Sequence, residues 1–490
     1  MSEQVRVDVV TRRPMSAERT AVLVFGSEVA HLQPLPAAEQ RLVRQLQRRA
    51  TFRRDEGGTA EAALDDGKRA LAAIDLGPSD SFDERRLDKL LERLARESQA
   101  AGVRSVAILV PEHDRFAGEE VAARIARALA LATYRFGRHE KPGRTPLLRT
   151  AHLVVPAAWR KSYSRGAEFG TALAAGVAFA RDLANTPPNE ATPDWMSRQA
   201  RAAAKRWGAR ISVLGPAELR RRRMGGLLAV GGGSENPPRM VRLEMGRGPR
   251  TVALVGKGVT FDTGGISIKP AGQMDEMKWD KCGACAVLGI FEALSRLDLR
   301  VRVRAYLPFA ENMPDGKAYR PGDIVRCANG KTVEILNTDA EGRMILADAL
   351  SWAAEEKPDD LLEFSTLTGA CVVALGPTGA GLFTPSDELA TSLLAAAGDA
   401  GERLWRLPLW PEFLDEMRGS HADLRNSGGR WGGASTAAAF LSQFVSPVSR
   451  WAHLDIAGPA YVGGDSNPKR GATGYGVALT VDWLRRLAGD

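Results

Sequence analysis

The sequence predicts an α/β protein of two domains: a smaller N-terminal α/β domain and a larger C-terminal α/β domain with a central mixed sheet flanked by helices. Three observations support this fold class. Strand-like and helix-like segments alternate along the chain. A chain of 490 residues exceeds one ordinary hydrophobic core. A long helix-like segment is stopped by Pro187 and Pro188, which marks a division between two parts.

The N-terminal domain is expected over residues 1–163, followed by a connecting helix over 164–184 and the second domain over 185–490. The N-terminal domain contains no recognisable chemical motif, so its His and Asp residues are interpreted as surface or capping groups. Its clearest elements are strands at 21–25 and 103–110 and amphipathic helices at 81–98 and 118–135.

The second domain continues the alternation, and its residues 251–256 form a nearly continuous apolar run, typical of a strand buried on both faces. Asn329-Gly330 predicts a hairpin turn between strands at 324–327 and 332–336. Gly231–Gly233 lacks the spacing of a phosphate-binding loop and is interpreted as a turn. The other expected elements are helices at 194–207, 281–294 and 344–355 and strands at 210–214, 240–245, 301–307 and 361–367.

The composition indicates a globular protein, with a formal charge of +8 from 67 basic and 59 acidic residues. This small excess permits an anionic partner without requiring one. The run Arg220–Arg223 is interpreted as the solvated face of a short helix, with nucleic-acid binding as the minority interpretation. No signal peptide or membrane span is visible and the four cysteines form no disulfide framework, so a cytoplasmic protein is expected.

The segment NTDAEGR at 337–343 places Asp339 and Glu341 two residues apart, directly before a helix. On extended backbone, this spacing would point both carboxylates the same way. Like charges held together need a cation between them or one raised pKa. Gly342 and Arg343 would open the helix, where free backbone N–H groups and the guanidinium suit a small anion. Alone, the segment is equally compatible with a solvated turn and a helix cap.

A second charged cluster follows the buried strand at 251–256 and contains Lys257, Asp262, Lys269 and Asp280. Open α/β sheets bind their ligands where central strands end, and the nearby glycines allow close backbone approach. Asp280 alone would be read as a helix N-cap. With six scattered histidines and no HExxH pair, any metal site must consist mainly of carboxylates.

These clusters, taken with their flanking strings, show that the chain resembles the leucyl aminopeptidases, di-metal exopeptidases of the cytosol. The resemblance covers residues 185–490 with long strings in the family's order, whereas the N-terminal part is similar only in size and α/β character. The matching strings are LANTPPN (183–189), VGKGVTFDTGG (255–265), SIKP (267–270), MDEMKWD (274–280), ENMPDGKAYRPGD (311–323), NTDAEGR (337–343), TLTGA (366–370), HLDIAG (453–458) and GATGYG (471–476).

The resemblance implies two divalent metals per subunit, manganese or zinc. Asp262 and Glu341 would bridge them, Asp339 would complete one site, and Lys257 with Asp280 the other. The residues themselves support the carboxylates, because oxygen-rich sites suit Zn²⁺, Mn²⁺ or Mg²⁺. Lys257 is assigned by resemblance alone, since an amine must lose its proton before it binds a metal.

The resemblance also implies hydrolysis of the N-terminal peptide bond, preferably after Leu or another apolar residue, by a water that bridges the metals. Lys269 would stabilise the oxyanion, and Arg343 would hold a bicarbonate, with contacts from Gly342 and Leu367. The expected partners are peptides with a free N-terminus, and family members assemble as hexamers. Positions expected to line the substrate pocket are Met277, Asn337, Ala340, Thr366 and Gly369.

Three residues beside Asp280 depart from the family pattern: Trp279, Lys281 and Cys285. They leave the implied ligands intact but bear on substrate preference and metal choice. Cys282 and Cys285 share a helix face and allow a redox interpretation, although a structural role is favoured. The alternative function is DNA binding by the arginine-rich surface, in addition to or instead of peptidase activity. A di-metal phosphatase is disfavoured because the expected histidine ligands are missing.

Overall fold

The computed structural model describes residues 4–25, 32–53, 57–64, 67–82, 84–137, 148–464, 467 and 470–489. The chain forms two compact units, Met1–Ala178 and Phe179–Asp490. The long helix α5 (Arg160–Asn185) contains the point of division. The domain limits predicted at 163 and 185 lie on either side of this point and stay predictions.

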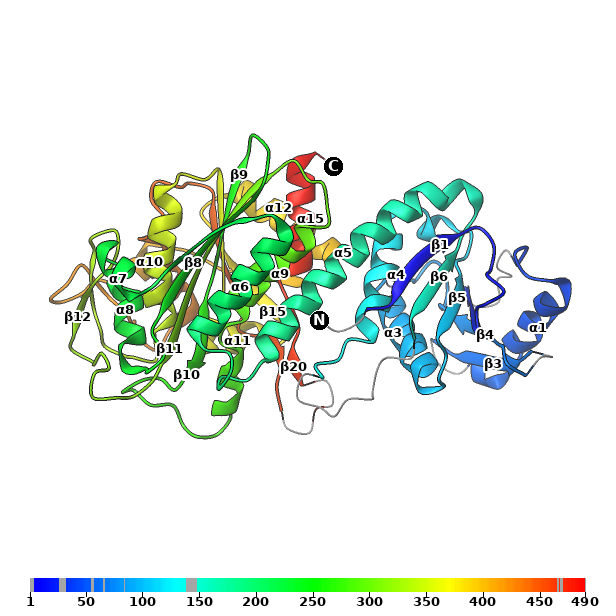
Figure 1. Ribbon diagram of the computed structural model, residues 1–490, viewed down its shortest axis with the longest axis horizontal. Coiled ribbons are helices and arrows are strands. Elements are labelled where there is room, and N and C mark those ends of the chain that lie inside the picture. Colours follow the sequence, from blue (N-terminus) through cyan, green and yellow to red (C-terminus); the bar gives the residue numbers. More distant parts are fainter. Residues whose placement is uncertain are drawn as a thin grey trace. The chain divides into compact units, whose positions relative to one another are not determined.

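The N-terminal unit is built on a six-stranded sheet of order β1-β6-β5-β2-β4-β3, which is parallel except for β3 against β4 (Figure 1). Two buried apolar clusters cover its two faces. The predicted helix at 81–98 begins at Glu84, and residue 83 lies outside the described residues. The elements are β1 (Arg6–Val10), β2 (Arg19–Val24), α1 (Ala37–Gln47), α2 (Ala50–Arg53), β3 (Thr59–Ala63), β4 (Ala70–Asp75), α3 (Glu84–Ala100), β5 (Ser105–Leu109), α4 (Glu119–Ala132) and β6 (Thr150–Val154).

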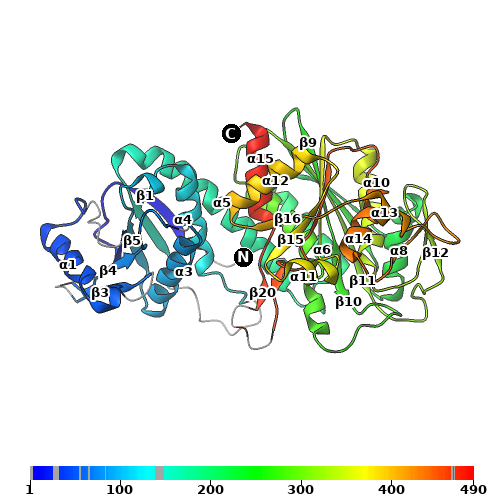
Figure 2. The same ribbon diagram turned by 180° about the vertical axis from the view of Figure 1, so that it is seen from behind.

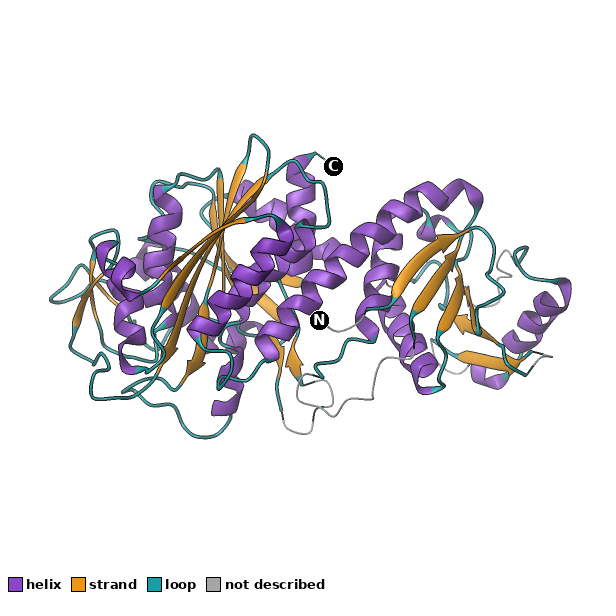
Figure 3. Ribbon diagram, viewed as in Figure 1, coloured by secondary structure: helices purple, strands orange, loops and turns teal. Residues whose placement is uncertain are grey.

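The C-terminal unit contains a nine-stranded mixed sheet, whose strands are orange in Figure 3. The strand order is β16-β15-β18-β14-β9-β11-β8-β7, with β10 paired to β11. Parallel pairs occupy the centre, and antiparallel pairs join β15 to β18 and β8 to both β11 and β7. The mixed α/β fold is therefore confirmed. The main strands are β7 (Arg210–Leu214), β8 (Arg239–Gly246), β9 (Thr251–Gly256), β10 (Gly258–Asp262), β11 (Arg302–Asn312), β14 (Asp360–Ser365), β15 (Gly379–Phe383), β16 (Arg403–Arg406) and β18 (Trp451–Asp455).

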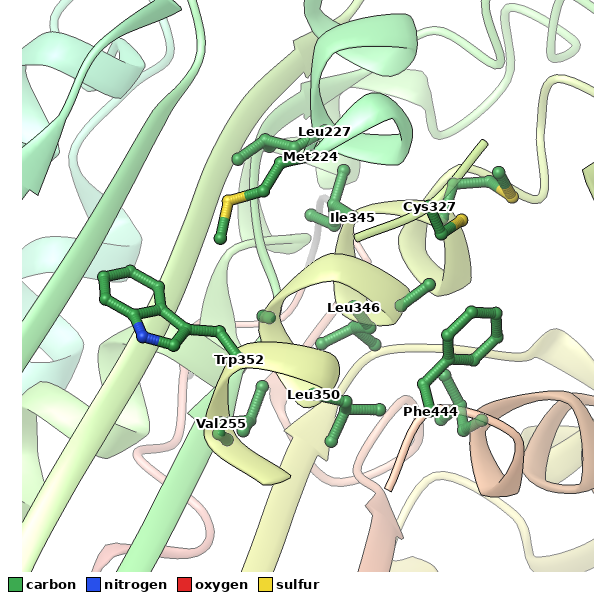
Figure 4. Packing of buried hydrophobic residues seen from close by; sticks show 14 of the residues in the cluster. Met224, Leu227, Val255, Cys327, Ile345, Leu346, Leu350, Trp352 and Phe444 are labelled. Carbon is green, nitrogen blue, oxygen red and sulfur yellow. The ribbon is translucent and has the colours of Figure 1, made fainter. Parts of the chain in front are cut away.

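Helices cover both faces of this sheet (Figures 1 and 2). Helices α6, α9, α12 and α15 pack over one face, and α8, α10 and α14 pack over the other. Figure 4 shows part of the apolar core beneath α10, where Ile345, Leu346 and Leu350 lie against Val255 of β9 and Phe444. The helices are α6 (Pro193–Trp207), α7 (Pro216–Arg221), α8 (Gly225–Val230), α9 (Cys282–Leu294), α10 (Gly342–Glu355), α11 (Gly369–Leu375), α12 (Asp387–Ala400), α13 (Pro411–Asp415), α14 (Gly433–Ser442) and α15 (Val477–Ala488).

Most local predictions are confirmed. Strand β9 is buried along almost its whole length, and β12 (Ile324–Arg326) pairs antiparallel with β13 (Thr332–Glu334) around Gly330, whose φ is +90°. The run Arg220–Arg223 is exposed at the end of α7. Gly231–Gly233 forms one 3₁₀ turn. Within the described part of the chain, no helix has the length and apolar character that a membrane span requires.

Several strands are missing from the sequence prediction, and one of them, β10, carries a residue of the charged cluster. Strand β10 begins directly after Lys257, and its short alternation at 259–262 lies within a glycine-rich segment that also contains Gly256, Gly258 and Gly264. It forms because β11 continues to Asn312, past the end predicted at residue 307, and offers Phe309 and Ala310 as parallel partners for Gly258 and Val259. This added strand carries Asp262 at its end.

Candidate active site

The charged residues of the site come from separate elements whose ends meet at one edge of the sheet. Strand β9 ends directly before Lys257, and β10 ends at Asp262. The 3₁₀ segment η4 (Met274–Trp279) ends directly before Asp280, and Glu341 directly precedes α10. Because β9, β10 and β14 are parallel to the strands beside them, their carboxyl ends lie at the edge where open α/β sheets bind ligands.

Three carboxylates gather at this edge. One oxygen from each of Asp262, Asp280 and Glu341 lies within 4.8 Å of the other two, and all three residues are buried. Oδ2 of Asp280 has no hydrogen-bond partner among the described residues. A buried carboxylate oxygen without a donor is costly, so this site is chemically suited to a cation.

Lys257 pairs with two of these carboxylates. Its Nζ lies 2.8 Å from Oδ1 of Asp280 and 2.9 Å from Oε1 of Glu341, and it donates to the carbonyl oxygen of Thr366 at 3.0 Å. Burial opposes the charged form of the amine, but the carboxylates of Asp280, Glu341 and Asp262 outweigh it and raise the pKa of Lys257. The pair Asp280 and Glu341 is therefore neutralised in part by a protonated lysine.

Gly342 gives Lys257 the space for this approach. A Cβ atom at Gly342 would lie 2.6 Å from Cε and 2.7 Å from Nζ of Lys257, closer than carbon atoms approach in folded proteins. Glycine is thus needed at the first position of α10 because the Lys257 side chain occupies the space of a Cβ. The backbone conformation at this position would accept other residues.

Lys269 makes the corresponding contacts on the other side of the site. Its Nζ lies 2.8 Å from Oδ2 of Asp262 and also pairs with Oδ1 of Asp339. Burial lowers the pKa of Lys269, but the negative charges of Asp262 and Glu341 outweigh burial, so the pKa is raised. The side chain therefore carries its positive charge at neutral pH.

The carboxylates in turn resist ionisation. Burial, followed by the charge of Asp262, raises the pKa of Glu341 to about 8. Burial raises the pKa of Asp280 to about 6 against the opposing effect of Lys257. Asp339, which is only partly buried, also has a raised pKa, because of burial and then Asp262. The site thus concentrates more negative charge than its two lysines neutralise, as the sequence predicted for like charges held together.

The segment before α10 differs from its prediction. Asp339 and Glu341 do not lie on extended backbone: the amide of Asp339 donates to Oδ1 of Asn337 at 2.8 Å, and Glu341 has helical φ and ψ of −72° and −37°. The Asn337 side chain folds the segment into a turn. As a result, Asp339 faces Lys269 while Glu341 faces Lys257.

Asp280 is also not the N-cap that its position before a helix allows. Its Oδ1 pairs with Lys257 and accepts the Thr366 hydroxyl at 2.7 Å. Lys281 occupies the N-cap position of α9, without a capping side-chain bond.

Arg343 lies in the first turn of α10 and is buried. Burial lowers the pKa of its guanidinium to about 10, against the opposing charges of Glu341 and Asp455. Its Nε has no hydrogen-bond partner among the described residues. The amide of Leu367 donates to Oδ1 of Asp455 at 3.2 Å, so any anion contact from Leu367 would involve other atoms of that residue.

The positions expected to line a substrate pocket border this charged centre. Met277 lies on η4, three residues before Asp280. Thr366 bonds Asp280, and Gly369 is exposed at the start of α11. Asn337 and Ala340 lie half-buried in the turn before α10.

Comparison with known proteins decides the family. A model of the catalytic domain of the cytosol aminopeptidase family matches residues 178–481, and a model of its N-terminal domain matches residues 22–141. The chain belongs to the cytosol aminopeptidase family. It is therefore a peptidase, and the family's N-terminal domain is recognised where the sequence strings showed only general similarity.

Individual relatives cover nearly the whole length. A probable cytosol aminopeptidase from Azoarcus sp. (strain BH72) is 40% identical over 485 residues, which cover 95% of this chain and 96% of the relative. A probable cytosol aminopeptidase from Roseiflexus castenholzii is 45% identical over 430 residues, which are 85% of this chain and 87% of the relative. Among solved structures, the bottromycin maturation enzyme BotP in complex with Mn is 36% identical with a TM-score of 0.83, covering 96% of this chain and 100% of its own. A mutant of tomato leucine aminopeptidase is 30% identical with a TM-score of 0.87, covering 99% and 97%.

Several residues that support the site were missed by sequence reasoning. The side-chain Nδ2 of Asn312 donates to Oδ1 of Asp262 at 2.8 Å and to the carbonyl oxygen of Thr338 at 3.0 Å. Asp455 binds the Thr368 hydroxyl at 2.7 Å in addition to the Leu367 amide, and so fixes the loop that carries Thr366. Asn312 and Asp455 lie within the strings at 311–323 and 453–458, which is the signal that could have identified them.

The cysteine pair, Cys282 and Cys285, is buried within α9. Burial raises the pKa of Cys285 to about 12 and that of Cys282 well above its ordinary value. Thiols of raised pKa are poor nucleophiles, so the structural interpretation of the pair is favoured over the redox one.

Proposed function

We propose that the chain is a metal-dependent aminopeptidase that hydrolyses the N-terminal residue, preferably Leu or another apolar residue, from peptides. The observation that carries this proposal is the meeting of Asp262, Asp280, Asp339 and Glu341 with two lysines at one sheet edge. Membership in the cytosol aminopeptidase family supports the reaction class.

The donor set fits two divalent cations. Carboxylate oxygens are ligands for Mn²⁺ and Zn²⁺, and the unpaired buried Oδ2 of Asp280 is one such oxygen. Asp262 and Glu341 would be shared between the ions, Asp339 would bind one of them, and Asp280 with Lys257 the other. BotP, similar in sequence and fold, was solved in complex with Mn. When bound, such ions supply a nucleophilic water of lowered pKa and polarise the scissile carbonyl.

Lys257 binds a metal only after Nζ loses its proton, although the metal-free site raises its pKa. The contacts that hold this proton are the carboxylates of Asp280 and Glu341. Dications at these carboxylates would remove that stabilisation and disfavour the ammonium. Lys257, now a counter-ion of Asp280 and Glu341, could then act with Asp280 as a ligand.

Lys269 and Arg343 would act on the reacting groups directly. The ammonium of Lys269 retains its proton, so it can stabilise the oxyanion that develops on the scissile carbonyl. The unpaired Nε of Arg343 and the start of α10 at Gly342 suit a small anion, and a bicarbonate there would accept the proton of the nucleophilic water. Leu367 would add a contact to this anion.

The substrate would bind with its free N-terminus at the charged centre and its first side chain beside Met277, Thr366 and Gly369. Met277 supplies a flexible apolar surface on η4, which suits Leu and Met side chains. Asn337 and Ala340 would contact the peptide on the side of the turn before α10.

The test is release of Leu from Leu-p-nitroanilide. Activity should disappear on treatment with a chelator, return with Mn²⁺ or Zn²⁺, and be abolished by Asp339→Ala. The control Asp298→Ala removes an exposed acid outside the site and should keep wild-type activity. Full activity after complete metal removal would contradict the proposal.

We also expect a cytoplasmic hexamer, as in the family that the sequence resembles, and size-exclusion chromatography with light scattering measures the assembly. DNA binding stays the alternative prediction. Of the arginine run, Arg221 and Arg222 already pair with Glu218 and Glu355 at 2.8 Å and 3.8 Å. Duplex binding that falls steeply with salt would support it.

A further inference from the structure

Segment η4 carries Met277 and ends directly before Asp280, yet it has little internal support. It is a 3₁₀ segment of six residues, preceded by Gln273 in the left-handed region (φ +63°) with no capping side-chain bond. Short 3₁₀ helices have poor hydrogen-bond geometry and depend on their surroundings. The position of the segment must therefore be set by other elements.

The main external support is the hairpin of β19 (Tyr461–Val462) and β20 (Gly471–Ala472), which follows β18. The Tyr461 ring stacks on the Trp279 ring, with centroids 4.7 Å apart and planes 24° apart. A side chain of the hairpin thus contacts the last residue of η4.

The backbone of the hairpin adds a second contact. Oε1 of Glu276 accepts the amide of Gly464 at 3.0 Å, and a Cβ at Gly463 would lie 2.5 Å from the same oxygen. Glu276 is buried. The absence of a side chain at Gly463 is therefore what lets the hairpin reach the carboxylate.

Trp279 is held by contacts from an earlier segment of the chain, the end of α5, and from a later one, the hairpin. Its Nε1 donates to Oδ1 of Asn185 at 2.9 Å, and the same oxygen accepts the amide of Ala472 of the hairpin at 2.9 Å. The Arg470 guanidinium lies 5.4 Å from the Trp279 ring centroid and pairs with Asp275. Trp279 thus lies between the end of α5 and the hairpin.

We propose that Tyr461 is a positioning residue that, by stacking on Trp279, sets the position of η4 and with it of Met277 and Asp280. This inference rests on the proposed function for its consequences. Asp280 would hold a metal and Met277 would contact the N-terminal side chain of the substrate. The hairpin therefore controls both the metal affinity at Asp280 and the preference among N-terminal residues of the substrate, although it would contact neither the metal nor the substrate.

The first experiment measures hydrogen exchange of the metal-free protein over residues 274–280, which requires neither metal nor substrate. Tyr461→Ala should speed exchange there by about two- to tenfold, the effect of losing one aromatic pair. Tyr461→Phe keeps the stack and should exchange nearly as slowly as wild type. Trp159→Ala removes the Trp159–Tyr163 stack of the N-terminal unit and should leave residues 274–280 unchanged. Equal exchange in wild type and Tyr461→Ala would overturn the proposal.

The second experiment measures the consequences. Titration with Mn²⁺ should show one of two sites weakened by about two- to tenfold in Tyr461→Ala and restored in Tyr461→Phe. The ratio of kcat/KM for Leu and Ala amides should change in Tyr461→Ala alone. Unchanged Mn²⁺ affinity together with an unchanged ratio would overturn the positioning role. Inactivity of the wild-type protein would refute the proposed function instead, and the exchange result would still decide the position of η4.

Discussion

Nζ of Lys257 lies 2.9 Å from Oε1 of Glu341, in space that exists because the next residue, Gly342, has no side chain. Lys257 needs this space to reach Glu341 and Asp280, and it would need the same space to act as the proposed metal ligand. The relationship links a residue at the end of β9 to the first turn of α10, two elements separated by a long stretch of chain.

Gly342→Ala should therefore disable the site without unfolding the protein. The new Cβ would lie 2.6 Å from Cε of Lys257 and displace the amine from Asp280 and Glu341. We expect a loss of Mn²⁺ binding at the Asp280 site by at least about tenfold, measured by titration. Gly398→Ala in α12 is a matched helical control because its Cβ meets nothing within 4 Å, so it should bind Mn²⁺ as wild type does. Wild-type binding in Gly342→Ala would refute the steric argument.

Lys269→Met should lower kcat by about 10²–10³-fold, the usual effect of removing one oxyanion donor, with a smaller change in KM. The metal content should stay at the wild-type level, because Lys269 is not expected to be a ligand. Steady-state kinetics and elemental analysis measure both quantities. Lys317→Met, at an exposed lysine, serves as the control. An unchanged kcat in Lys269→Met would remove Lys269 from the mechanism.

The buried Asp348 should make stability depend on pH. Burial raises its pKa to about 7 from an ordinary value of 3.8, despite hydrogen bonds from the amides of Leu227 and Ala328. Between these values the folded state holds a proton that the unfolded state has lost. The free energy of unfolding therefore decreases as pH rises through this window, by up to about 4 kcal/mol.

Asp348→Asn removes this titration. The thermal midpoint of Asp348→Asn minus that of the wild type should therefore increase as the pH is raised from 5 to 7.5. Parallel pH curves for the two proteins would show that Asp348 is already ionised in the folded state at pH 5.

The four cysteines should resist thiol reagents in the native protein. All are buried, and burial raises the pKa of the Cys285 thiol to about 12. Titration with a chromogenic disulfide should label them only after denaturation, when all four react. Rapid native labelling of Cys282 or Cys285 with loss of peptidase activity would instead favour the redox interpretation.

The sequence predicted those parts of the fold that local signals determine. Strand β9 follows from its continuous apolar run, and the β12–β13 hairpin from Asn329-Gly330. Strand β10 was missed because it has only five residues in a glycine-rich segment and is stabilised by pairing with β11. The turn at Asp339 was misjudged because the Asn337 side chain competes with extended backbone.

The charged residues of the site were all recognisable, because four acids and two lysines recur at strand and helix ends. Their supporting contacts were not, since they join residues far apart in sequence. Asn312 bonds Asp262 across 50 positions, and Tyr461 stacks on Trp279 from the other end of the domain. Such contacts leave no pattern in a single sequence.

The most direct test of the account is the number of metal ions held by these acids. After equilibration with Mn²⁺ and gel filtration, the wild-type protein should contain two ions per chain, Glu341→Gln should lose both, and Asp280→Asn should keep one. Peptidase activity should follow the metal content. A wild-type protein that holds no metal and still releases Leu, or two ions retained in Glu341→Gln, would contradict the claim that these acids form a di-metal centre.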